Sequence, residues 1–225
     1  MQLFHGSSNI IEQPVFGGGK LHNDYGRGFY CTKSYDMACE WAVDVDRDGV
    51  VNQYEIDARE LKVLDLNSHQ YTVINWLAIL LANREFDIQS DFGSEAKQYL
   101  LANFLVDDYD KYDLIIGNRA DDRYFSFAQD FLNNVISVRT LSRAMHLGEL
   151  GEQVVLKSSK AFEAIKYVSY TDVKRSEWYF KKSGRDTGAR KQYDDMKREP
   201  WTRGETYVLQ IIEEEIKNND ERLRF

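Results

Sequence analysis

Cysteine and proline are scarce in this sequence of 225 residues, which contains two of each. Cys31 and Cys39 are too few to build a disulfide framework, so the sequence fits a reducing compartment and predicts a cytoplasmic protein. The scarcity of proline, together with a hydrophobic content of 43%, argues against long disordered tracts and predicts a chain that folds around a real core.

A secretory leader and a membrane-spanning run are not apparent either. A strand-like segment starts almost directly after Met1, and the longest apolar run, near residues 73–82, is too short and too interrupted to cross a bilayer. We therefore expect no contact with a membrane. The formal net charge of −8 argues against general binding to polyanions. Basic residues outnumber acidic ones in residues 174–203, which we interpret as solvated helix faces.

Hydrophobic periodicity divides the chain into short strands and amphipathic helices in irregular order. The predicted strands are residues 2–5, 29–32, 50–57, 61–66, 114–117, 153–157 and 166–170, and the predicted helices are residues 35–43, 71–84, 94–106, 123–136, 139–147 and 159–165. This order lacks the regular alternation of a doubly wound sheet, so it predicts an α+β domain over residues 1–170. Residues 171–225 are charged and weakly apolar, and they predict a helical extension packed on that domain.

Two patterns that often bind ligands have weaker support here. The glycines at 17–19 neither follow a clear strand nor open a helix, so they do not fit a dinucleotide-binding loop. The EF-hand spacing is matched by Asp44, Asp46, Asp48 and Glu55. An EF-hand needs a helix after its loop, whereas strand-like alternation follows Asp48. We interpret the segment as an Asp-rich turn and do not expect calcium as a cofactor, with a calcium loop as the alternative.

Polar residues at the ends of three predicted strands form the candidate site. His5 and Gly6 end the first strand, Tyr30 lies on the second, and Glu152 and Gln153 precede the apolar run at 154–156. Polar residues at glycine-rich corners are a common way for a sheet to present a binding site, because glycine lets a ligand approach the backbone.

The segments around these residues resemble the ADP-ribosyltransferase superfamily, in its poly(ADP-ribose)-polymerase-like branch, and within it a bacterial group named DUF3990. The resemblance is carried by Phe4-His5-Gly6-Ser7, residues 23–30, Glu40-Trp41-Ala42, residues 54–57 with 63–66, residues 117–122 and residues 151–157. These segments run in the family's order and extend the match over nearly the whole chain.

The resemblance implies a split β-sheet that binds NAD⁺ through a His–Tyr–acid signature on three strands. His5 would hydrogen-bond a ribose hydroxyl, and the backbone of Gly6 would bind the nicotinamide amide. Tyr30 and Trp41 would sandwich the nicotinamide ring, since a flat cationic ring favours aromatic faces. Trp41 is alternatively a core residue of its helix. The other binding candidates in the matched segments are Ser7, Asn23, Gly28, Thr32 and Asp121, the last of which is alternatively a helix cap.

The third signature position has two candidates. The polymerase-like pattern points to Glu152, whereas the DUF3990 pattern points to Gln153. Adjacent strand residues face opposite sides, so both cannot serve equally without a bulge. We favour Gln153, which can hydrogen-bond ribose and acceptor but supplies no negative charge.

The sequence thus predicts an NAD⁺-dependent ADP-ribosyltransferase that modifies a protein or nucleic-acid acceptor and releases nicotinamide. The resemblance also implies a bacterial toxin restrained by a small antitoxin protein. The alternatives are a non-catalytic module that binds NAD⁺ or ADP-ribose, an NAD⁺ glycohydrolase, and an enzyme like the RNA 2′-phosphotransferases. The last would need arginines in the pocket, for which Arg27, Arg119 and Arg123 are the candidates. The sequence suggests no metal partners for His22, His69 or His146.

Overall fold

The computed structural model describes residues 1–120, 124–147, 151–200 and 202–225, and within them the fold is of the α+β class. An antiparallel three-stranded sheet has the order β1 (Gln2–Ser7), β3 (Gly49–Ile56), β7 (Ile165–Val173). A four-stranded sheet has the order β2 (Phe29–Cys31), β6 (Glu152–Leu156), β5 (Leu114–Asn118), β4 (Val63–Asp65). In this second sheet β4 and β5 are parallel, and the other pairs are antiparallel.

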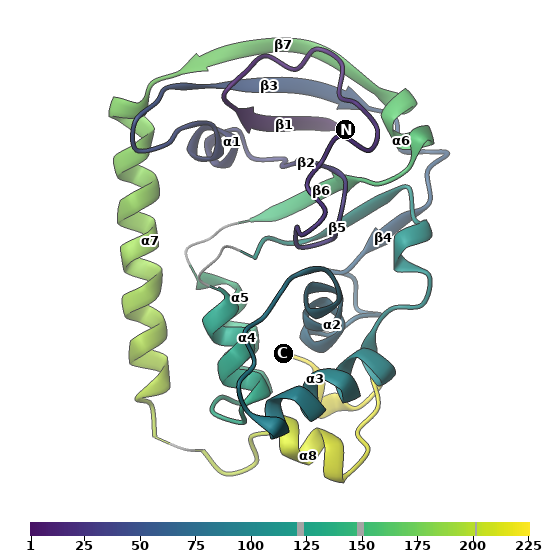
Figure 1. The fold of residues 1–225 in the computed structure, drawn as a ribbon, viewed down its shortest axis with the longest axis vertical. Helices are drawn as coiled ribbons and strands as arrows, with labels where there is room; N and C mark the ends of the chain where they lie inside the picture. Colours follow the sequence, from purple (N-terminus) through teal and green to yellow (C-terminus); the bar gives the residue numbers. More distant parts are fainter. Residues whose placement is uncertain (121–123, 148–150, 201) are drawn as a thin grey trace.

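The helices gather mainly beyond the four-stranded sheet (Figure 1). They are α1 (Tyr35–Ala42), α2 (Val73–Asn83), α3 (Asp91–Phe104), α4 (Tyr124–Leu132), α5 (Val138–Met145), α6 (Ser159–Ala164), α7 (Arg175–Lys197) and α8 (Val208–Glu213), with 3₁₀ turns at Tyr109–Lys111 and Glu221–Leu223. Among the described residues, no helix combines the length and the apolar character needed to cross a membrane.

The predicted elements agree with this architecture, with shifted ends. Ser34 caps α1 at the predicted start of the helix, because its side chain accepts a hydrogen bond from the Met37 N–H. The helix predicted at 94–106 starts earlier, at Asp91, because the Ser90 side chain caps it. The strand predicted at 61–66 pairs only over Val63–Asp65. The last strand continues past residue 170 to Val173, because it pairs with β3 along its whole length.

Three apolar clusters of the described residues form the core around the two sheets. Between the sheets, Leu3 and Tyr54 pack against Val154 and other apolar residues of the four-stranded sheet. On the far side of that sheet, Val155 contacts a larger helical cluster, at whose centre lies the almost wholly apolar α2. Phe4 packs instead against α1. The strand alternation of Leu3 and Phe4 thus divides them between two apolar clusters.

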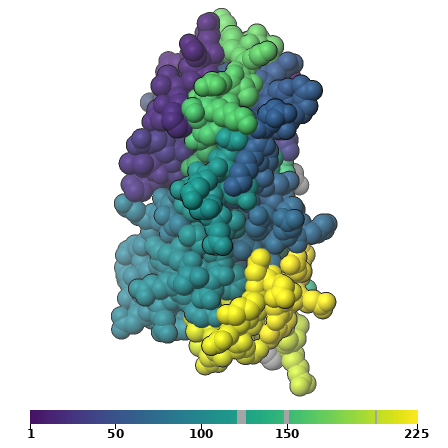
Figure 2. Space-filling view, turned by 90° about the vertical axis from the view of Figure 1, so that its right-hand side faces the viewer, coloured from purple at the N-terminus to yellow at the C-terminus, as the bar shows by residue number. Residues whose placement is uncertain are grey.

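The helix α7 connects the two ends of the molecule (Figure 1). Near its middle, Arg185 forms a largely buried ion pair with Glu40 of α1. Near its end, the Tyr193 hydroxyl donates to Asp130 of α4 at 2.6 Å, and the Tyr193 ring packs on Phe127. Figure 2 shows the segment after α7, in yellow, forming one continuous surface with the teal helices of the base.

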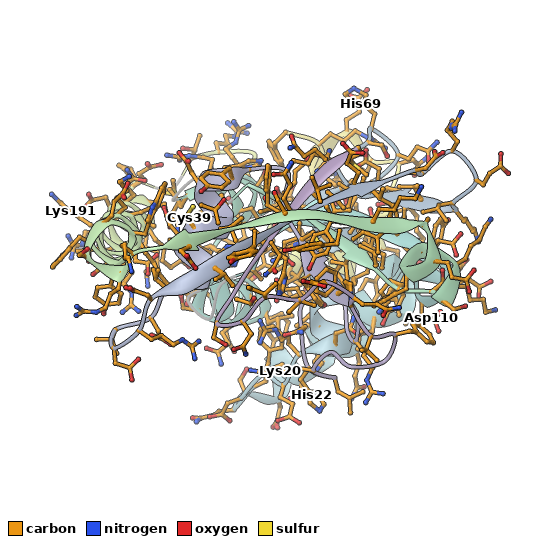
Figure 3. The ribbon with its side chains drawn as sticks, turned by 90° about the horizontal axis from the view of Figure 1, so that it is seen from above. Lys20, His22, Cys39, His69, Asp110 and Lys191 are labelled. Carbon is orange, nitrogen blue, oxygen red and sulfur yellow. The ribbon has the colours of Figure 1, made fainter. Side chains whose placement is uncertain are left out.

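The Asp-rich turn at residues 44–48 leads directly into β3, in agreement with the strand predicted after Asp48. The Asp48 carboxylate accepts hydrogen bonds from the Lys174 ammonium at 2.9 Å and from the Arg175 N–H at 2.7 Å, so it ties the turn to the start of α7. Among the described residues, no group of three or more His, Cys, Asp or Glu side chains is placed to hold a metal ion. Figure 3 shows His22 and His69 on opposite sides of the molecule.

The close approach of α1 to β1 yields a stability prediction for Gly6→Ala. A Cβ at residue 6 would lie 1.9 Å from the Ala38 carbonyl oxygen and 2.7 Å from the Ala42 nitrogen. Both are backbone atoms, so the helix would have to move, and we expect a loss of about 2–3 kcal/mol in the free energy of unfolding, as for an overpacked core. Urea denaturation measures it.

Gly184→Ala is the matched control, because nothing lies within 4 Å of the Cβ position on the exposed face of α7. It should gain about 0.5–1 kcal/mol from higher helix propensity. Equal unfolding midpoints for the two variants would contradict the packing role of Gly6.

Candidate functional site

A cavity of about 800 Å³ lies where the two sheets, α1 and the loop after β1 meet. We call it the central cavity. Its lining includes seven of the predicted site residues, namely His5, Gly6, Asn23, Gly28, Tyr30, Trp41 and Gln153. Ser7, Thr32 and Glu152 are not part of this lining, and Asp121 lies outside the described residues.

Residues of β2 hold the side chain of His5, which lies on β1. Its Nδ1 lies 2.7 Å from the Tyr30 carbonyl oxygen, and its ring packs on Phe29 with centroids 4.5 Å apart. Because a carbonyl oxygen only accepts, Nδ1 carries the proton. Burial lowers the pKa of His5 below its usual value, so the ring is neutral at pH 7. Its Nε2 is therefore a hydrogen-bond acceptor, as binding to a ligand hydroxyl requires.

The Tyr30 hydroxyl is occupied by the turn that precedes β2. It accepts a hydrogen bond from the Tyr25 N–H at 3.0 Å and donates to the Gly26 carbonyl oxygen at 2.6 Å. Gly26 has φ +75°, a conformation that favours glycine. Burial raises the pKa of Tyr30 further above its usual value, so the hydroxyl stays protonated. What Tyr30 has to offer a ligand is the ring rather than the hydroxyl.

Gln153 is buried and bound to a carboxylate. It is 4% exposed, and its Nε2 donates to Asp24 Oδ2 at 3.0 Å. Asp24 Oδ2 also accepts from the Ala120 N–H at 2.9 Å, while Oδ1 accepts from Arg84 Nε at 3.0 Å and from its terminal nitrogen at 2.8 Å. Burial raises the pKa of the Asp24 carboxyl above its ordinary value, and the positive charge of Arg84 opposes that rise.

Glu152 faces away from the central cavity. Its carboxylate accepts from the Lys33 ammonium at 2.9 Å and from the Asn67 amide at 2.7 Å, and these contacts hold its pKa below the usual value. It lines a second cavity of about 480 Å³. The β5–β6 pairing runs without a bulge, with Gly117 opposite Gln153 and Asn118 opposite Glu152. Strand alternation therefore brings Gln153, and not Glu152, to His5 and Tyr30.

Trp41 lies on α1 and is partly buried. The Arg119 guanidinium lies 4.9 Å from its ring centre, a cation–π distance. Its indole Nε1 is buried and has no hydrogen-bond partner among the described residues. Trp41 thus borders the cavity but is no simple core residue, because one side of its ring is next to a charged group.

Three of the small site candidates have structural roles. Gly6 allows α1 to lie against β1, as its close backbone neighbours show. The Ser7 hydroxyl donates to the Asn9 carbonyl oxygen and accepts from Asn52. Thr32 is 1% exposed, and its hydroxyl accepts from the Ser34 N–H before α1. The hydroxyls of Ser7 and Thr32 therefore bond the loop after β1 and the start of α1, and neither residue lines the central cavity, so their role in cofactor binding stays a prediction.

A family model described as "Protein of unknown function (DUF3990)" matches residues 1–167. The chain belongs to the DUF3990 family. Comparisons with curated proteins and with solved structures gave no match. The DUF3990 match contains every residue of the central cavity. It ends within β7, so α7 and α8 lie outside it.

Sequence reasoning assigned no role to three charged residues of this DUF3990 cavity, Lys20, Asp24 and Arg84. Asp24 stands in a segment that carried the resemblance but was given no role, and the only sign of Arg84 was its place at the end of an apolar helix. Lys20 and Phe29 also line the cavity. Of the arginines named for a phosphotransferase, Arg119 lines it, Arg27 is exposed elsewhere, and Arg123 lies outside the described residues.

The buried ion pair predicts how Arg84→Met responds to pH. Without Arg84 the pKa of Asp24 rises further, since only the hydrogen bonds from Ala120 and Gln153 then oppose the effect of burial. A carboxyl whose folded pKa is raised contributes stability below its unfolded pKa, and that contribution is lost as pH rises through the folded pKa. We expect a loss of about 3–5 kcal/mol at neutral pH and a smaller loss near pH 4, measured by urea denaturation.

The double variant Asp24→Asn with Arg84→Met is the control, because it has no carboxyl left to titrate at this position. Between pH 4 and pH 7 it should therefore lose less stability than Arg84→Met alone does. If Arg84→Met alone were equally destabilised at pH 5 and pH 8, Asp24 would not be the group that depends on Arg84.

Proposed function

We propose that this DUF3990 protein is an NAD⁺-dependent ADP-ribosyltransferase whose active site is the central cavity. One observation carries the proposal: His5 from β1, Tyr30 from β2 and Gln153 from β6 line the same cavity. These are the three strand positions that the resemblance to the superfamily names. On this proposal, the pair of open sheets corresponds to the split sheet of that superfamily.

The chemistry of the lining suits the parts of NAD⁺. The neutral His5 ring offers an acceptor for a ribose hydroxyl, and the Tyr30 and Trp41 rings offer faces for a flat cationic ring. Lys20 and Arg119 bring positive charge to the same cavity, which favours a pyrophosphate. A cavity of about 800 Å³ is also in the size range of ligand sites in proteins.

The proposed reaction breaks the bond between nicotinamide and ribose. The electron pair leaves with nicotinamide, the ribose carbon passes through an oxocarbenium-like state, and a nucleophile of the acceptor attacks that carbon and gives up a proton. His5 and the aromatic rings hold the two sides of the bond in place, which lowers the entropic part of the barrier. Gln153 contributes a hydrogen bond and no charge, so electrostatic stabilisation of the cation is weaker than with a carboxylate.

The proposal extends to the biological role that the resemblance implies. The acceptor is a protein or a nucleic acid, and the enzyme acts as a bacterial toxin held in check by a small antitoxin protein. The second candidate is a non-catalytic module that binds NAD⁺ or ADP-ribose. The neutral Gln153 at the third position favours it, since the Asp24 carboxylate behind Gln153 is already saturated with donors.

Binding of NAD⁺ tests the proposal directly. We expect calorimetry to detect binding by the wild type, and a lysate with labelled NAD⁺ to show label transfer together with nicotinamide release. His5→Ala should weaken NAD⁺ binding by roughly tenfold or more, because it removes a buried hydrogen bond and the contact with Phe29. Tyr30→Ala should abolish transfer, since it removes the ring and the hydroxyl that holds the Tyr25–Gly26 turn.

His69→Ala is the matched control for His5→Ala. His69 is exposed and lies on the opposite side of the molecule from Lys20, which lines the central cavity (Figure 3). Binding without nicotinamide release would favour the non-catalytic module, and release without label transfer would favour a glycohydrolase. If the wild type neither binds NAD⁺ nor releases nicotinamide, the proposed function is overturned.

A further inference from the structure

Asp24 borders the central cavity, but protein donors already occupy its carboxylate. Its two oxygens already accept four hydrogen bonds, two from Arg84, one from the Ala120 N–H and one from Gln153. A carboxylate has about four lone-pair sites, so these donors fill them. Asp24 therefore acts on the cavity through its neighbours and not as a base.

The contact with Asp24 decides which way the Gln153 amide points. A carboxylate only accepts hydrogen bonds, so the amide nitrogen must face Asp24 Oδ2, and a flipped amide would place two oxygens against each other. The amide oxygen is thereby turned away from Asp24. Hydrogen bonding of the nitrogen to an anion also makes the amide oxygen a stronger acceptor.

The Gln153 amide oxygen lacks a hydrogen-bond donor among the described residues. It is also buried. Buried polar atoms in proteins are nearly always hydrogen-bonded, so an exception beside a cavity indicates a donor that arrives with a ligand. Gln153 lines the central cavity together with His5, whose Nε2 is another neutral acceptor.

The geometry points to Asp24 as a positioning residue of the site: with Arg84 behind it, Asp24 fixes and polarises the Gln153 amide so that its oxygen binds a hydroxyl or N–H donor of the ligand. This inference rests on the proposed function for the identity of the ligand. It also explains why residue 153 is an amide, since a carboxylate there would lie against Asp24 Oδ2.

A double-variant cycle with NAD⁺ as the probe tests the inference. Gln153→Ala and Asp24→Asn should each weaken NAD⁺ binding by roughly tenfold, as measured by calorimetry. The double variant should bind no more weakly than Gln153→Ala alone, because Asp24 acts only through Gln153. A merely structural role of Asp24 would persist in the Gln153→Ala background. Asp113→Asn is the control for a lost structural carboxylate, since Asp113 accepts from Lys62 and Ser158 away from the cavity.

A reciprocal exchange gives a second measurement that does not depend on the single Asp24→Asn variant. Gln153→Glu should lower the melting temperature and NAD⁺ affinity more than the uncharged Gln153→Met, because two carboxylates would meet. Adding Asp24→Asn to Gln153→Glu should recover both, since the new amide can donate to the new carboxylate.

The outcomes separate the inference from the proposed function. If the wild type binds NAD⁺ and Asp24→Asn binds it equally well, or if the two losses simply add, the positioning role is overturned while the proposed function stands. A Gln153→Glu variant that melts with the wild type, or an exchange that recovers nothing, also overturns the role. If the wild type binds neither NAD⁺ nor ADP-ribose, the proposed function fails and the inference fails with it.

Discussion

The buried carboxylate of Asp24 holds together parts of the chain that are far apart in sequence. It joins the loop before β2, the end of α2 at Arg84, the residue Ala120 after β5, and Gln153 on β6. A charge that is 3% exposed is tolerated only where donors surround it, and removing one partner leaves an uncompensated charge. The positions of these segments are therefore coupled.

The opposite wall depends on backbone pairing rather than on charge. Phe4 and Thr32 exchange two backbone hydrogen bonds, at 2.8 Å and 2.9 Å, which connect the edge of one sheet to the edge of the other. This contact brings His5 to the carbonyl of Tyr30. The buried Asn52 adds a third element, because its side chain bonds the backbone of Asn9 and Ile11 and so holds the loop that closes the cavity. The Phe4–Thr32 pairing thus joins the two sheets, and Asn52 fixes the loop that lines the central cavity beside them.

Much of the fold could be predicted from local pattern. Period-two alternation located β3, and the same alternation argued correctly against a helix after Asp48. The apolar residues of α2 gave its position, although periodicity alone could not show that it is central. The α+β class and the DUF3990 family are confirmed, whereas the ADP-ribosyltransferase assignment stays a proposal. Strand ends were less predictable, since pairing partners such as β3 for β7 decide them.

The site was harder to predict because its contacts are non-local. Both Glu152 and Gln153 are polar, and only the register of β6 against β5 shows which one faces the cavity. The pairing of Asp24 with Arg84 joins residues 60 positions apart, and no local spacing encodes it. The contacts of Ser7 and Thr32 were hard to predict for a similar reason: their hydroxyls bond a loop and a helix start that the sequence showed only in outline.

The end of the family match has a consequence for how this protein can be divided. The match stops at residue 167, in the middle of β7, and the residues that follow it pair with the Gly49–Gln53 half of β3. A fragment that ended there would expose a row of unpaired backbone groups along β3, an open edge that recruits other chains and promotes aggregation. The limit of sequence similarity therefore lies inside a strand whose whole length pairs in the three-stranded sheet.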